Sequence, residues 1–246
     1  MFIFNLIIQC KRVQVLDRAA GLTLRVLLAF FPFLVFLMAL MGFMDLDAEV
    51  IIVGLYEVLP SEVSGLVSGF ITEITGTRSA GVLSAALFFS IYNTVNGFRA
   101  VIRSTNEGEE RSFFVQIGLS FALMLLFSAA LIVMLMFLVF DSGIVGWAGA
   151  LVVLFVFTSF IFKLTQVKIY FAGAAFTVVA WVGVSIVFGF VTSNFSQLPA
   201  IYGSIAGVFI LCIWLNAVSV ILLVGGEINL LLYDFRDHKK IRQNGG

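Results

Sequence analysis

Charged residues are scarce in this chain, because only 11% of its 246 residues are Asp, Glu, Lys or Arg. A soluble domain carries about 25% charged residues, and a domain of this length still exposes much of its surface to water. The scarcity of charge therefore excludes a soluble globule. The formal net charge is zero, with 14 basic and 14 acidic residues, so the composition gives no indication of a nucleic-acid partner.

Histidine, cysteine and proline are also rare. The chain has a single histidine, His238, two separated cysteines, Cys10 and Cys212, and neither a CxxC nor an HExxH motif. These absences leave no recognisable zinc site or histidine-based catalytic set, so we expect no metal, no cofactor and no enzymatic activity. Three prolines beside 28 phenylalanines also exclude a disordered chain, which needs low hydrophobicity and high net charge.

Hydrophobic residues make up 61% of the chain and fall into long runs without charge. A helix needs about 20 apolar residues to cross a hydrocarbon core about 30 Å thick. The runs predict an all-α membrane protein with six transmembrane helices in a single integral membrane domain, residues 1–246. The predicted spans are about 21–44, 79–103, 113–140, 143–162, 169–192 and 201–233.

The basic residues predict how these spans are oriented. Twelve of the 14 lie before the first span, at the end of span 2 or between spans 2 and 3, between spans 4 and 5, or after span 6. Arg78 alone lies in the opposite connections, together with seven acidic residues. Because basic residues gather in cytoplasmic loops, we expect both termini in the cytoplasm.

Two segments outside the spans have amphipathic patterns. Residues 1–16 place their charge after the apolar part, unlike a signal peptide, and so predict a cytoplasmic interfacial helix. The outer loop between spans 1 and 2, residues 45–78, predicts amphipathic helix. Its apolar residues recur at helical spacing, at Val63, Leu66, Val67, Phe70, Ile71 and Ile74.

Polar residues within the spans are the candidate site, because an ionisable group there normally faces the bundle and has a partner. Arg25 in span 1 and Glu227 in span 6 lie at similar depths, so we predict that they pair directly or through water. Other polar residues at comparable depth are Asn229, Asn93, Asn96, Arg99 and Arg103. Either the cluster holds the helices together, or it forms a polar vestibule that is open to the cytoplasm and receives a substrate. Pro32 predicts a kink in span 1.

Several motifs resemble the YihY/BrkB family of bacterial inner-membrane proteins. Residues 27–32 read LLAFFP, which is similar to the family's first-helix signature LLSLFP. Residues 81–106, ending at Asn106, and the ERSF at 110–113 resemble its second helix and the following inner loop. Residues 202–204 (YGS), Trp214 and residues 225–229 (GGEIN) resemble the pattern of its sixth helix.

The resemblance implies six helices in the bacterial plasma membrane and adds Asn106 to the candidate site. The sequence departs from the family at Ala29, Gly226 and residues 88–89, and its connection between Lys163 and Lys168 is short and lacks a proline. An old ribonuclease label attached to this family has no support in these residues. They include no pair of histidines, no acidic metal cluster and no basic groove.

Two functions agree with this reading. One is a transporter or flippase-like protein for a lipid-like or other amphipathic envelope substrate, with membrane lipids as its surroundings. The alternative is a scaffold that transports nothing and holds an envelope-assembly partner. An intramembrane enzyme is disfavoured because Glu227 is the only acid inside a span. The sequence does not determine an oligomeric state.

Overall fold

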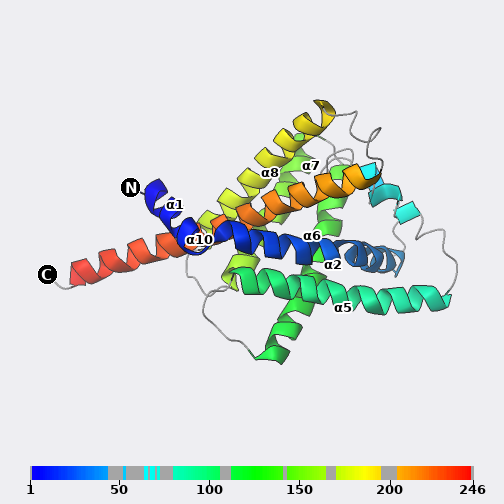
Figure 1. The fold of residues 1–246 in the computed structure, drawn as a ribbon, viewed down its shortest axis with the longest axis horizontal. Helices are drawn as coiled ribbons and strands as arrows, with labels where there is room; N and C mark the ends of the chain where they lie inside the picture. Colours follow the sequence, from blue (N-terminus) through cyan, green and yellow to red (C-terminus); the bar gives the residue numbers. More distant parts are fainter. Residues whose placement is uncertain are drawn as a thin grey trace.

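The computed structural model describes residues 2–43, 52–53, 64–65, 67–69, 71–72, 80–105, 112–140, 143–164, 170–194 and 204–244. Within these ranges all regular structure is α-helical, which confirms the all-α class (Figure 1). The long elements are α1 (Phe2–Arg12), α2 (Val15–Phe43), α5 (Ala80–Thr105), α6 (Phe113–Phe140), α7 (Ile144–Lys163), α8 (Phe171–Asn194) and α10 (Ser204–Asn244).

Each predicted span corresponds to one long helix. The bounds of α6 agree with the prediction, and those of α5, α7 and α8 differ from it by one or two residues. The larger differences lie in the first and last spans. The helix α2 begins at Val15 rather than at residue 21, and α10 continues to Asn244 rather than ending near residue 233.

In the part of the chain that the structure describes, five helices are long and apolar enough to cross a membrane, namely α2, α6, α7, α8 and α10. The remaining long helix, α5, has 26 residues and carries Arg99 and Arg103 in its second half. The count of six crossings therefore stays a prediction. The segment predicted as an interfacial helix is helical as α1, and its position at a membrane surface also stays a prediction. Pro32 lies inside α2, where the predicted kink is not tested.

The long helices pack in a ring that follows the order of the chain. The pairs α2 with α5, α5 with α6, α6 with α7, α7 with α8, and α8 with α10 are in contact, and α10 closes the ring against α2. In Figure 1, α10, α2 and α5 run side by side, whereas α6 crosses them steeply. Both chain termini lie at the end of the bundle where α2 begins (Figure 1). We call this the basic end, because Lys11, Arg12 and Arg18 lie at the end of α1 and the start of α2.

The centre of the ring is filled by aromatic side chains. The ring of Phe127 in α6 lies 5.3 Å from Phe33 in α2, 5.6 Å from Phe98 in α5 and 5.1 Å from Phe157 in α7, measured between centroids. Aromatic pairs at this spacing contribute about 0.5–1.5 kcal/mol beyond the area they bury. Phe127 therefore ties three helices of the ring together.

The outer loop contributes to the core at the opposite end from the termini. Residues 64–65, 67–69 and 71–72 are helical, and Val67 and Ile71 are buried in one cluster with Phe33 and Leu37 of α2. The predicted stripe is therefore buried at these two positions. Its other members, Val63, Leu66, Phe70 and Ile74, lie outside the described residues.

We expect Ile71→Ala to destabilise the protein, because truncating a buried isoleucine costs about 2–5 kcal/mol. Ile71 is 1% exposed. The matched control is Gly69→Ala on the same segment, where an added methyl group meets open space. Thermal unfolding in detergent should show a lower Tm for Ile71→Ala and no loss for the control. Equal melting of the two variants would mean that this segment does not hold the bundle together.

Cysteine labelling tests the predicted orientation. In a background with Cys10 and Cys212 replaced by serine, a cysteine at Ser61 should react with a membrane-impermeant maleimide added to intact cells. A cysteine at Ser104, near the end of α5, should react only after the membrane is opened. Reaction at Ser104 in intact cells would reverse the assignment of the two sides.

Candidate functional site

Two helices cross at the basic end with their backbones in close contact. A Cβ atom added to Gly173 in α8 would overlap the carbonyl oxygen of Gly225 in α10. A Cβ atom added to Gly225 would overlap the hydroxyl of Thr177 and lie 3.1 Å from the ring of Phe162. The crossing therefore requires glycine at both positions. Such small residues are what allow helices to approach closely within membranes.

Asn229 uses this close approach to cap the start of α8. The backbone N–H of Gly173 donates to Asn229 Oδ1 at 2.7 Å, and Asn229 Nδ2 donates to the carbonyl of Tyr170 at 3.4 Å. The first N–H groups of a helix have no partner within that helix, so a buried helix start needs acceptors from elsewhere. Both ends of the Asn229 amide are directed at α8, which favours a structural role for this residue.

Glu227 forms a salt bridge with Arg18 of α2. Its Oε1 lies 3.9 Å from Arg18 Nη1, and the glutamate side chain is 5% exposed while that of the arginine is 26% exposed. Arg18 Nη2 also donates to the carbonyl of Ser104, close to the end of α5. Arg18 thus links α2, α5 and α10 at the basic end.

In place of the predicted direct contact with Arg25, Glu227 pairs with Arg18. The alternative, a contact of Glu227 with Arg25 through water, stays a prediction. Arg25 lies seven residues further along α2, about 10 Å away at 1.5 Å per residue. The prediction measured depth from the ends of the spans. Since α2 starts six residues before its predicted bound and α10 continues eleven residues past its own, those ends do not mark the limits of the packed helices.

Cys10 of α1 lies beside the same pair. Burial raises the pKa of the Cys10 thiol above its ordinary value, and the negative charge of Glu227 raises this pKa further. Cys10 packs in the cluster that contains Val15, Ala19 and Leu22 of α2 together with Leu222 of α10. The thiol is therefore protonated at neutral pH, and α1 is held against the bundle next to Glu227.

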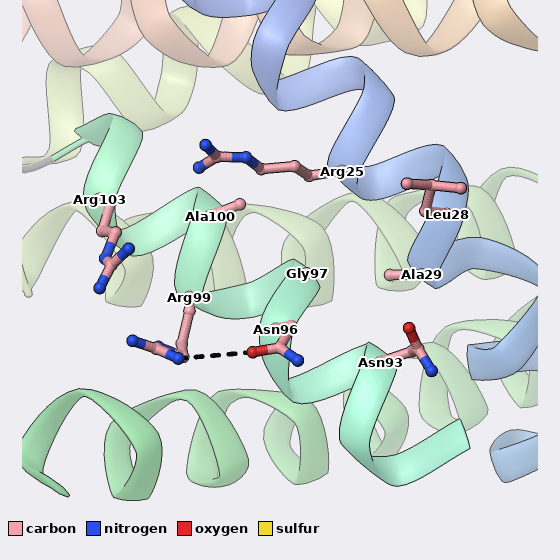
Figure 2. A pocket seen from close by; sticks show the side chains of 9 residues that line it. All are labelled: Arg25, Leu28, Ala29, Asn93, Asn96, Gly97, Arg99, Ala100 and Arg103. Carbon is pink, nitrogen blue, oxygen red and sulfur yellow. Dashed lines mark hydrogen bonds between the residues drawn. The ribbon is translucent and has the colours of Figure 1, made fainter. Parts of the chain in front are cut away.

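Arg25 belongs to a different part of the structure, a cavity of about 280 Å³ between α2 and α5. Among the described residues, three arginines and two asparagines line it, and no acidic residue does. We call it the arginine pocket; its lining is Arg25, Leu28, Ala29, Asn93, Asn96, Gly97, Arg99, Ala100 and Arg103 (Figure 2). Gly97 allows the two helices to meet here, because a Cβ atom at this position would lie 2.6 Å from that of Ala29.

Two of the three guanidinium groups are held by α6. Arg99 lies over the ring of Phe113, 4.8 Å from its centroid, and its Nη1 donates to Asn96 Oδ1 at 3.4 Å. Arg103 Nε donates to Gln116 Oε1 at 3.1 Å. Among the described residues, no salt bridge, hydrogen bond or ring contact engages the side chain of Arg25, which is exposed. Arg25 therefore keeps its donors available.

Of the remaining predicted site residues, one lines the pocket and one lies outside the described residues. Asn93 lines the pocket and donates from Nδ2 to the carbonyl of Phe89 at 2.8 Å, within its own helix. Asn106 lies outside the described residues. Within the described part of the chain, no group of three or more His, Cys, Asp or Glu side chains could hold a metal ion.

Sequence reasoning missed Arg18, Phe113 and Gln116. Arg18 was assigned to the segment before the first span, although its position seven residues before Arg25 places both on nearly the same face of one helix. Phe113 and Gln116 lie at the start of α6, the helix that directly follows the arginine-bearing end of α5. Phe113 is indicated by the sequence only as part of the ERSF motif at 110–113, and Gln116 only by its polar side chain in the first turn of α6.

Comparison with known families agrees with the motifs. Residues 6–245 match the family described as Virulence factor BrkB. The chain belongs to the BrkB family. The family resemblance predicted from the motifs is thereby confirmed. Together with five helices that are apolar enough to span a membrane, it identifies a multi-pass bacterial membrane protein.

One relative of this BrkB family chain is the ribonuclease-like protein YfkH of Bacillus subtilis (strain 168). The two are 29% identical over 246 residues, which covers 88% of this chain and 90% of the relative. No solved structure matches the chain. In this BrkB protein, the residues at 225–229 now have structural explanations. Gly225 permits the helix crossing, Glu227 pairs with Arg18, and Asn229 caps α8.

A double-mutant cycle tests the corrected ion pair. We expect Glu227→Gln and Arg18→Gln each to lower the stability in detergent, because each leaves a charge without its partner. The double variant should recover part of the loss, with a coupling of about 1 kcal/mol or more, as found for residues in contact. The partial exposure of Arg18 places this value toward the lower end of that range.

Arg25→Gln is the matched control, since it removes the same charge from the same helix two turns further on. Its combination with Glu227→Gln should be additive to within about 0.5 kcal/mol. Coupling of Glu227 to Arg25 rather than to Arg18 would restore the original pairing and overturn the corrected one.

Proposed function

We propose that this protein moves an anionic amphipathic substrate, of the lipid class, across the bacterial plasma membrane, and that the arginine pocket is where the substrate's charged part binds. In this proposal both termini face the cytoplasm, so the pocket opens toward the inner leaflet. The protein binds and moves its substrate without making or breaking bonds.

The observation that carries the proposal is the concentration of uncompensated positive charge in the pocket. Arg25, Arg99 and Arg103 line one cavity, and no acidic residue of the described part of the chain lines it with them. A charge within a membrane-spanning segment costs about 2.5–3.5 kcal/mol on insertion scales, so three of them together need a reason. An anionic headgroup supplies the counter-charge that the protein itself does not place in the lining.

The other polar groups of the predicted cluster support this division of roles. Glu227 and Asn229 are engaged by Arg18 and by the start of α8, and neither of them lines the pocket. The structural and the vestibule interpretations of the cluster therefore apply to different residues. Packing explains the α10 residues, whereas it gives no account of the exposed Arg25.

Reconstitution into liposomes tests transport directly. Vesicles of zwitterionic lipid would contain a trace of phosphatidylglycerol with a fluorophore on one acyl chain, and dithionite would quench the probe in the outer leaflet. We expect probe from the inner leaflet to reach the outer leaflet, and so to be quenched, faster in vesicles that contain the protein than in protein-free vesicles. Arg25→Gln should slow this exchange about tenfold, as expected for the loss of one charge-assisted hydrogen bond.

Arg236→Gln is the control, because Arg236 is an exposed arginine on α10 that does not line the pocket. It should exchange lipid at the wild-type rate. If lipid exchanges no faster with the wild-type protein than in empty vesicles, transport of this lipid is excluded and the scaffold alternative is favoured. If Arg25→Gln exchanges as fast as wild type, the pocket is not the route.

A further inference from the structure

The arginine pocket continues outward into an apolar surface on the same helix. Phe88, Phe89 and Tyr92 of α5 are 79%, 62% and 64% exposed, and we call them the aromatic strip. Phe88 and Tyr92 are one turn apart, and Asn96 of the pocket lining follows one turn later on the same face. On α2, Leu28 lines the pocket and is 65% exposed.

This arrangement places exposed aromatic side chains one to two turns along α5 from a charged cavity. The cavity of about 280 Å³ is close to the lower limit of small-molecule sites, about 300–1,000 Å³, and therefore suits a headgroup rather than a whole lipid. The aromatic strip offers apolar surface for a chain attached to that headgroup. A free anion would use the cavity and leave the strip without a role.

The donors in the cavity favour a phosphate group. Arginine presents its N–H groups in a planar fork that matches phosphate and carboxylate oxygens. Figure 2 shows the Arg25 side chain extending from α2 along α5, toward the turn that carries Arg103. Arg99 is already stacked on Phe113, and its buried Nε has no hydrogen-bond partner in the structure. The lining of the pocket therefore includes guanidinium groups from two helices, α2 and α5.

The number of charges favours a monoester over a diester. A phosphate monoester carries about −1.5 to −2 charges at pH 7, because its second pKa is near 6, and it offers three terminal oxygens. A phosphodiester such as phosphatidylglycerol carries one negative charge. The described lining residues include three arginines and no acid, so they give the cavity three positive charges, which the monoester offsets more completely.

We infer that the arginine pocket, with the aromatic strip, selects a lipid whose headgroup is a terminal phosphate monoester. This inference rests on the proposed function in taking the pocket as the substrate site, and it adds the chemical class of the substrate. Arg25 is the recognition residue, since it is the guanidinium with its donors available. Arg99 and Arg103 complete the counter-charge from α5.

Binding to the full-length protein in detergent tests the inference. The probes are dioleoyl phosphatidic acid, dioleoyl phosphatidylglycerol and inorganic phosphate, and bound lipid is measured by native mass spectrometry together with the shift in Tm. We expect phosphatidic acid to bind about tenfold more tightly than phosphatidylglycerol. Inorganic phosphate at millimolar concentration should displace little of it, because it cannot use the aromatic strip.

Arg25→Gln should weaken the binding of phosphatidic acid about tenfold. Arg25→Lys should weaken it less, because a lysine keeps the positive charge but lacks the planar fork of N–H donors. Arg103→Gln gives a second test should Arg25→Gln fold poorly, and Arg236→Gln is the unaffected control. Equal affinity for the two lipids, or a preference that survives both pocket variants, would overturn the inference. Full displacement by inorganic phosphate would show a simple anion site.

The lipid-exchange assay distinguishes this failure from failure of the proposed function. Selective binding of phosphatidic acid without any exchange would refute transport and leave the ligand class standing. Exchange of both lipids at equal rates, sensitive to Arg25→Gln, would refute the monoester preference and leave transport standing.

Discussion

The contact between α8 and α10 is the constraint on which the rest of the basic end depends. It is possible only because Gly173 and Gly225 have no side chains, so that two backbones meet. That approach fixes the position of α10 and brings Asn229 within reach of the start of α8. It also sets where Glu227 lies, and Glu227 in turn receives Arg18 of α2. The position of the α2 wall of the pocket therefore follows from a glycine pair on two other helices.

Hydropathy was sufficient to predict the long helices, because the length of apolar chain that crosses a bilayer is nearly fixed. It predicted less well where helices continue beyond the apolar run. Arg18 and the residues after 233 are polar, so the sequence pattern ended the spans before them, whereas the backbone stays helical. The backbone hydrogen bonds of a helix continue past the last apolar residue. Because the predicted span began after Arg18, the prediction did not consider Arg18 as the partner of Glu227.

The polar cluster was predicted as one group because its members have similar depth. Depth along a helix says nothing about which neighbour a side chain faces. The structure separates the group by direction, with Asn229 toward α8 and Arg25 toward α5. Interhelical partners such as Gln116 could not be found without the packing of α5 against α6. The sequence therefore indicated that the spans contain a polar site, whereas only the packing of the helices shows which polar residues line the pocket and which hold helices together.

The ring of helices closes between its first and last members, and this order has a consequence for biogenesis. The helices α2, α5 and α6 that form and support the arginine pocket are all synthesised before α10. Until α10 enters the membrane, however, Arg18 lacks its carboxylate and the start of α8 lacks its amide cap. A chain that ends before residue 204 would thus lack the partners of both groups. The last helix supplies contacts that the earlier helices cannot make among themselves, so the basic end is complete only when synthesis is.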